Sequence, residues 1–309
     1  MVSVPWPFFI ACCVAGLLLV GIGVDYFTDG AVAEARRLGT SVMLLGMIGL
    51  GLEPESLGET LGGATDPAAT ALAAIVGSIT FTALAGLGLG ALVAPVAVVP
   101  TRTHRAAVGL MVVLPVVLAL VVADGSLSRI DGGVLLALAP IAIVGLWWVG
   151  RGEQEPMAAA PATSRVGTWA FIGFLMMMSG AGLLESAARG AIERLDTRNL
   201  AIGMVVIAMA LSLEELPRMW VPVWRGRPEL AVANVTGTAI LLVSANAGVL
   251  GLTSPLTIPT GSLWWHLGAM LAAVVLAALA LASGCTTRPM GAGLAGVYAL
   301  YACASLVLG

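Results

Sequence analysis

Two glutamates occupy matched positions in apolar stretches of the chain. Glu55 and Glu215 are 160 positions apart, and 23 positions after each comes a hydroxyl residue preceded by glycine, Ser78 and Thr238 respectively. An ionisable side chain at membrane depth costs roughly 2.5–3.5 kcal/mol on insertion scales, so it persists mainly where it pairs or binds something. Two such side chains at matched positions in the two halves of a membrane protein predict a transport site.

The sequence around these residues is that of a polytopic membrane protein. Of 309 residues, 59% are hydrophobic and 10% are charged, and the mean hydropathy is +1.03, far from the averages of soluble proteins. About 20 mainly apolar residues are needed to cross the hydrocarbon core as a helix. By this criterion we expect ten spans, at roughly 5–25, 40–61, 68–98, 106–124, 132–150, 166–190, 199–222, 228–252, 262–283 and 290–308.

The chain divides at residues 151–165, its most loop-like stretch. Five expected spans precede it, in residues 1–150, and five follow, in residues 166–309. An odd number of spans per half forces the second half to enter the membrane in the opposite orientation. Inverted repeats of this kind place a shared site near the midplane, lined by broken helices. We therefore expect an all-α fold of ten transmembrane helices, built as two inverted five-helix repeats with broken helices at the central site.

All 14 basic residues are arginines, and their distribution predicts the orientation. If the N-terminus lies outside, four arginines fall in outer loops, at positions 129, 189, 194 and 198. Ten fall in inner loops, at positions 36, 37, 102, 105, 151, 165, 218, 225, 227 and 288. This bias predicts a multi-pass protein of the plasma membrane (cell inner membrane) with both termini outside, although the outer cluster at 189–198 counts against it.

Other residue types predict no further chemistry. The four cysteines lack CxxC or Cys/His spacing, which predicts neither zinc nor disulfides. We expect His104 and His266 at membrane interfaces, and Met176–Met178 project in three directions from a helix. The sequence contains no Walker or dinucleotide motif, and no nucleophile–base pair, aspartate dyad or His-metal cluster is visible in the expected spans. We therefore expect a protein that is not an enzyme, with no cofactor and no nucleic-acid partner.

Three segments resemble the calcium/cation antiporter superfamily, whose members share a sodium/calcium-exchanger-type membrane region. Residues 23–39 look like the end of that family's first helix and the loop after it. Residues 203–215 look like the approach to its second glutamate, and residues 225–238 are similar to its Gly-Glu-x-x-Leu-Ala-x-Gly-Asn-x-x-Gly-Ser run. The resemblance covers about half the chain. It implies a secondary active cation antiporter in which the first and sixth spans are the moving element.

The chain departs from the family pattern mainly in its oxygen ligands. Pro54-Glu55, Ser212 and Asn234 are kept, but other family positions have changed. The family's Thr-Ser before Pro-Glu is Gly51-Leu52 in the first copy; in the second, its Thr is Leu211 and its Pro is Glu214. The Gly-Asn pair of the third span is Ala73-Ala74, and the Asn or Asp beyond Gly-Ser is Thr82 and Leu242. The thinned set of ligands should weaken sodium binding more than calcium or proton binding.

The remaining oxygens still suffice for a cation site. Calcium takes six to eight oxygen ligands at about 2.3–2.6 Å. Glu55 and Glu215 can supply four carboxylate oxygens, and Ser78, Thr238 and Ser212 supply hydroxyls. We expect these five residues to bind Ca²⁺ or a similar cation in exchange for H⁺ or Na⁺.

Several alternatives remain open at this stage. Ser78 and Thr238 are also typical of small helix-packing residues. Glu53 and Glu214 are expected to point elsewhere on their helices, with a proton relay as another role for Glu214. The eroded ligand set also fits a transport-inactive membrane scaffold or sensor that keeps the exchanger fold.

Overall fold

The computed structural model describes residues 6–51, 67–151, 153, 166–192, 212–257 and 263–308. In the first half the helical elements are α1 (Trp6–Leu38), α2 (Val42–Gly51), α4 (Pro67–Phe81), η2 (Thr82–Gly86), α5 (Leu87–Val93), α6 (Arg102–Val121), η3 (Val122–Asp124) and α7 (Arg129–Gly150). In the second half they are α8 (Val166–Ile192), η4 (Ser212–Glu214), α10 (Glu215–Trp224), α11 (Pro228–Leu241), η5 (Leu242–Asn246), α12 (Ala247–Thr253), α13 (Leu263–Ala282) and α14 (Arg288–Leu308).

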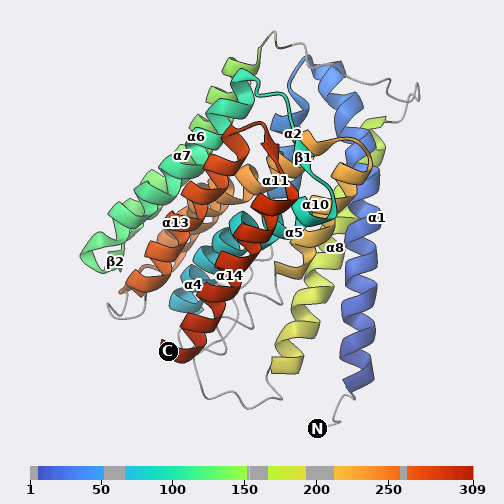
Figure 1. Cartoon of the computed structure of the whole chain (residues 1–309). Helices are drawn as coiled ribbons and strands as arrows, with labels where there is room; N and C mark the ends of the chain where they lie inside the picture. Colours follow the sequence, from blue (N-terminus) through green and yellow to red (C-terminus); the bar gives the residue numbers. More distant parts are fainter. Residues whose placement is uncertain are drawn as a thin grey trace.

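Seven helices in the described part of the chain are long and apolar enough to cross a membrane. They correspond to the expected spans one, three, four, five, six, eight and nine. The shorter helices α2 and α10 occupy parts of spans two and seven, beside residues 52–66 and 193–211, which lie outside the described ranges. Helix α14 occupies the tenth span, and it ends at the same end of the bundle at which α1 begins (Figure 1). The expected all-helical membrane fold is confirmed.

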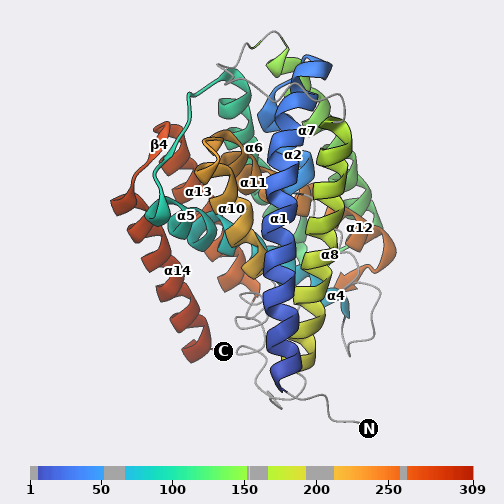
Figure 2. The same cartoon turned by 90° about the vertical axis from the view of Figure 1, so that its right-hand side faces the viewer.

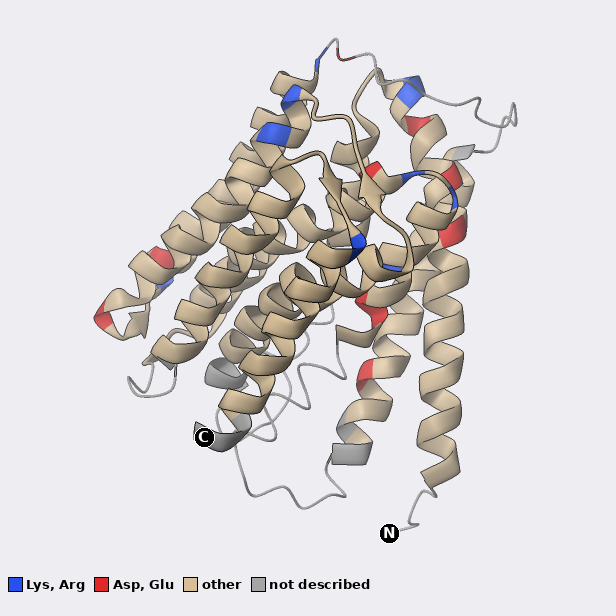
Figure 3. Cartoon of the chain, in the orientation of Figure 1, with Lys and Arg blue, Asp and Glu red and all other residues tan. Residues whose placement is uncertain are grey.

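The first helix is longer than the sequence predicted. We expected a span over residues 5–25 followed by a loop, but α1 continues without a break to Leu38. Its second half carries acidic and basic residues, which appear red and blue on this helix in Figure 3. Ala, Glu, Arg and Leu, which are good helix formers, dominate the end of this segment. The predicted span ended early because apolar content reflects charge rather than helix propensity.

The two halves repeat one another in local structure. The third and eighth spans each contain a π-helical turn, η2 and η5, which begin at Thr82 and Leu242 and are therefore 160 positions apart. This is the offset between Glu55 and Glu215. A π-helical turn in an α-helix is frequently found at a functional site. The matched pair shows that both copies of the repeat break their helix regularity at the same place.

In the described ranges, four two-residue strands connect the halves, and they were not predicted. Strand β1 (Val96–Ala97) pairs antiparallel with β4 (Cys285–Thr286), and β2 (Ser126–Leu127) pairs antiparallel with β3 (Leu256–Thr257). β1 and β3 follow the third and eighth spans, while β2 and β4 connect the last two spans of each half. Each pair thus joins one strand from each repeat, and the two pairs occupy equivalent places. Strands of two residues carry no periodicity that a sequence could reveal.

Helices α1 and α8 pack closely along their length, as Figure 2 shows. A Cβ atom added to Gly16 would lie 2.9 Å from the carbonyl oxygen of Gly180, and one added to Gly23 would lie 2.7 Å from that of Gly173. Such small residues let helix backbones approach one another in a membrane. The first and sixth spans therefore form one tightly packed pair.

Helix α11 lies at the centre of the bundle. All of its residues from Leu230 to Leu241 are buried, and it packs against α2, α6 and α10. Its approach to α2 is especially close, since a Cβ added to Gly51 would lie 2.4 Å from the carbonyl carbon of Gly237. This contact brings the end of α2, in the first repeat, against the middle of a central helix of the second repeat.

Candidate cation site

Two adjacent carboxylates lie inside the bundle where a short 3₁₀ turn leads into α10. Glu214 ends η4 and Glu215 begins α10, and they are only 4% and 2% exposed. Acidic groups in the first turn of a helix are stabilised by its dipole. Pro217 is tolerated in the same turn, because the backbone N–H groups there have no partner within the helix.

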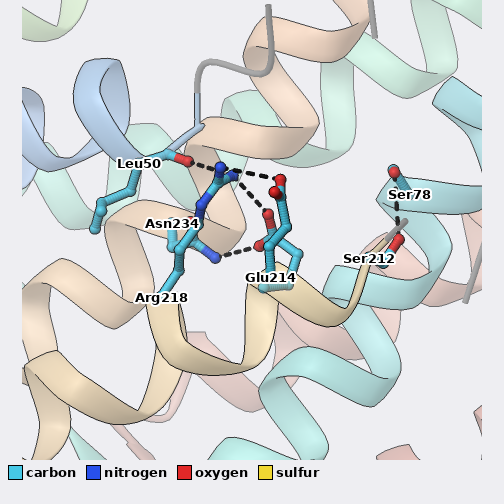
Figure 4. Close-up of polar contacts among 7 residues, drawn as sticks. Leu50, Ser78, Ser212, Glu214, Arg218 and Asn234 are labelled. Atoms are coloured by element: carbon cyan, nitrogen blue, oxygen red, sulfur yellow. Dashed lines mark hydrogen bonds and ion pairs between the residues drawn. The ribbon is translucent and has the colours of Figure 1, made fainter. Parts of the chain in front are cut away.

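The guanidinium of Arg218 holds both carboxylates. Its Nη2 lies 3.0 Å from Oε1 of Glu214, and its Nη1 lies 2.9 Å from Oε1 of Glu215. Arg218 follows the two glutamates by four and three positions, the spacings that place side chains on one face of a helix. The side chain of Arg218 is completely buried, and Figure 4 shows it between the carboxylates and α2.

Two further residues connect this cluster to neighbouring helices. The side-chain amide of Asn234, on α11, donates a hydrogen bond to Oε2 of Glu215. Nη1 of Arg218 also donates to the carbonyl oxygen of Leu50, at 3.2 Å. Leu50 lies on α2, in the first repeat. The cluster therefore joins the two repeats through one guanidinium group.

Ser78 and Ser212 form a separate contact between the repeats. Their hydroxyl oxygens are 3.4 Å apart, with Ser78 on α4 and Ser212 at the start of η4. In Figure 4 this pair lies to one side of the cluster around Arg218. The structure thus brings together one predicted ligand from each half of the chain.

Helix α11 also offers buried oxygens to this region. Asn234 and Thr238 are four positions apart and therefore lie on one face of the helix. Both are 0% exposed, and Oδ1 of Asn234 and Oγ1 of Thr238 make no hydrogen bond in the described part of the chain. A buried polar atom without a partner is costly, so each of these oxygens is suited to a ligand.

Four of the five predicted site residues lie in the described part of the chain. Ser212, Glu215 and Thr238 are buried and Ser78 is partly buried, while Glu55 lies outside the described residues, as do Glu53 and Pro54. Among the described residues, no three His, Cys, Asp or Glu side chains are grouped as a metal site. The oxygens present are those of a few carboxylates with hydroxyl, amide and carbonyl groups.

Sequence reasoning missed Arg218 and misjudged Glu214. We counted Arg218 among the inner-loop arginines, but its side chain is fully buried, and Glu214 contacts the same guanidinium as Glu215 instead of pointing elsewhere. The signal was present, because the residues are spaced i, i+3 and i, i+4. We missed it because a loop-charge count treats every arginine near a span end as solvated.

Two other sequence predictions are corrected. His104 is not an interfacial side chain but is 1% exposed, with Nε2 3.2 Å from the carbonyl oxygen of Leu281 on α13. Asp25 does not end the first span but lies within α1, where it forms an ion pair with Arg225 in the turn after α10. The hydrogen bond to Asp25 raises the pKa of Arg225, which therefore remains charged. This ion pair connects α1 to the segment that carries the cluster.

Comparison with known proteins is consistent over most of the chain. The family model described as "Sodium/calcium exchanger protein" matches residues 8–148 and 166–307. A relative named "Putative antiporter CaxA", from Alkalimonas amylolytica, is 26% identical over 78% of this chain and 79% of its own length. The inner membrane protein YrbG of Escherichia coli strain K12 is 28% identical over 79% of this chain and 80% of its own.

A solved structure shows the same fold. The sodium-calcium exchanger NCX_Mj, soaked with Na⁺ and Sr²⁺, matches with a TM-score of 0.79 and 23% sequence identity, over 96% of this chain and 98% of that one. The ten-helix inverted-repeat architecture expected from the sequence is confirmed by this match and by the two matched segments of the family model.

Proposed function

The chain belongs to the sodium/calcium exchanger protein family, and we propose that it exchanges Ca²⁺ or a similar cation against H⁺ or Na⁺ by alternating access. Family membership makes it a multi-pass membrane transporter of the cation-exchanger type rather than an enzyme. The transported cations are cargo in this proposal, and the protein needs no cofactor.

The observation that carries the proposal is the burial of Glu215 at the junction of the two repeats. A carboxylate that is 2% exposed inside an apolar helix bundle is retained where it has a function. We propose that Glu215 binds the cation together with Ser212, Ser78 and Thr238, and that Glu55 provides the equivalent carboxylate from the first repeat. Two observations support this ligand set: the hydroxyl of Thr238 has no hydrogen-bond partner among the described residues, and the two serines contact one another.

The repeat structure supports alternating access. Matched π-helical turns in the third and eighth spans suit a site whose two halves exchange roles as the protein opens to each side. We propose that α1 and α8 move together as one unit against the remaining helices. Their mutual glycine packing makes a rigid pair, which suits a rigid-body motion.

We propose that the protein lies in the cell inner membrane with both termini outside. Setting the buried Arg218 aside leaves nine inner-loop arginines against four in outer loops, which still favours both termini outside. A location in the cell inner membrane agrees with the name of the relative YrbG.

The ion pairs of Arg218 favour a second candidate function. A guanidinium already occupies Glu215, one of the two carboxylates proposed to bind the cation, so a transport-inactive scaffold or sensor with the exchanger fold is the alternative. The two functions differ in one measurable property, which is cation flux.

The test is transport in liposomes that contain the purified protein. Ca²⁺ uptake is measured against imposed Na⁺ and H⁺ gradients for wild type, Glu215→Gln and Glu55→Gln, with Asp124→Asn as a control in an exposed turn. We expect uptake driven by one gradient, lost in both glutamate variants and retained in the control. Absence of flux with every gradient and cation tested, in folded protein, would refute the antiporter and favour the scaffold.

A further inference from the structure

Arg218 places a positive charge where a transported cation has to bind. Arginine stays protonated in proteins, and a buried charge is stable only when it is paired. In the described part of the chain Arg218 is paired with the carboxylates of Glu214, at 3.0 Å, and Glu215, at 2.9 Å. We propose that Arg218 is a tethered competitor of the transported cation, which occupies Glu215 when the site is empty and releases it when an ion binds. This inference rests on the proposed function of Glu215.

The geometry allows Glu215 to be released while the arginine remains paired. The two carboxylates contact different nitrogens of the guanidinium, Nη2 for Glu214 and Nη1 for Glu215. Arg218 can therefore keep its ion pair with Glu214 while Nη1 withdraws from Glu215. Glu214 thus acts as the holding partner, because it keeps a carboxylate beside the buried guanidinium.

Oxygens are available beside the carboxylate that would be released. Asn234 already contacts Oε2 of Glu215, and its own Oδ1 is buried without a hydrogen bond in the described part of the chain. Thr238 presents a second such oxygen one helical turn further along α11. A cation at Glu215 would meet hard oxygen ligands of the kind that calcium and sodium prefer.

Release of Glu215 also affects the contact between the repeats. The nitrogen that contacts Glu215 is the one that donates to the Leu50 carbonyl oxygen at the end of α2. An ion that displaces Nη1 changes the partners of a group that links the two halves of the protein. Ion occupancy and the hydrogen bond between α10 and α2 are therefore coupled through a single side chain.

The competition has a measurable consequence, because an ion must break an existing bond before it binds. A hydrogen bond to a charged group typically contributes enough to change an equilibrium constant about tenfold or more. Removing the guanidinium should therefore tighten cation binding by about this factor. The experiment is ⁴⁵Ca²⁺ equilibrium dialysis with purified, detergent-solubilised protein whose folding is checked by size-exclusion chromatography.

Two variants separate competition from a change in net charge. Arg218→Gln removes the competitor and also makes the site more negative by one charge. Glu214→Gln/Arg218→Gln also removes the competitor but leaves the summed charge of the two residues unchanged, and it leaves one buried carboxylate, Glu215, without the guanidinium instead of two. Arg105→Gln, at an exposed position of α6, is the matched arginine control. Should Arg218→Gln fail to fold, the double variant carries the comparison.

We expect both Arg218 variants to bind Ca²⁺ about tenfold or more tightly than wild type, while Arg105→Gln binds as wild type does. Tight binding by the variants with none by wild type would support the inference more strongly. Equal or weaker binding by the folded double variant, beside measurable wild-type binding and flux, overturns the inference and leaves the antiporter intact. Absence of binding in every protein, together with absence of flux in liposomes, overturns both.

Discussion

Substitution of Gly23 by alanine tests the close packing of α1 against α8. The added Cβ would lie 2.7 Å from the carbonyl oxygen of Gly173 and 2.8 Å from the backbone nitrogen of Met177. Both are backbone atoms, so neither can turn away as a flexible side chain would. Since ordinary contact begins near 3.4 Å, the two helices must separate locally by about 0.7 Å or distort.

The expected cost follows from two opposing effects. Alanine stabilises the interior of a helix by about 0.5–1 kcal/mol relative to glycine, whereas overpacking a well-packed contact costs about 1–3 kcal/mol. Gly21 provides a matched control on the same helix, because a Cβ there would have no atom within 4 Å. The difference in unfolding free energy between Gly23→Ala and Gly21→Ala is therefore the packing cost alone, about 1–3 kcal/mol.

The assay is unfolding of the two variants in mixed detergent micelles, followed by circular dichroism as denaturing detergent is added. We expect Gly21→Ala to be at least as stable as wild type and Gly23→Ala to unfold at a lower detergent fraction. Because α1 and α8 are the proposed moving pair, ion flux in liposomes should also fall more for Gly23→Ala. Equal stability of the two variants, or a more stable Gly23→Ala, would refute the close packing.

Three further changes test the site and its surroundings. Gly237→Ala would place a Cβ 2.7 Å from a backbone oxygen of α2 and should cost about 1–3 kcal/mol of unfolding free energy; wild-type stability in the same titration would contradict this. Asn234→Ala removes the hydrogen bond from the side-chain amide to Glu215 and should lower the unfolding free energy by about 1.5–3 kcal/mol; an unchanged unfolding midpoint would count against that hydrogen bond. Asp25 and Arg225 are 36% and 48% exposed, so a double-mutant cycle with Asp25→Asn and Arg225→Gln should give a coupling below about 1 kcal/mol that weakens with salt. A coupling of several kcal/mol that is insensitive to salt would show that the ion pair is not solvated.

Sequence reasoning succeeded where the signal is local and periodic. Hydropathy located the long spans, and the shared 160-residue offset of Glu55 and Glu215 indicated the repeat that the π-helical turns also follow. It failed where we inferred helix ends and solvent exposure from charge alone. Charge was taken as the end of a helix, although α1 continues to Leu38, and charge near a span end was taken as exposure, although Arg218 is buried.

Composition and spacing were enough to determine a membrane protein of two inverted halves, because the bilayer requires apolar segments of a certain length. They also predicted two carboxylates at membrane depth, which pointed to ion binding. Only the tertiary structure decided which atoms meet Glu215, because its partners come from a neighbouring turn and from other helices: Arg218 from α10, Asn234 from α11 and, through Arg218, the Leu50 carbonyl from α2. Contacts between distant segments depend on how closely the helices approach, and here that approach is set by glycines such as Gly51 and Gly237.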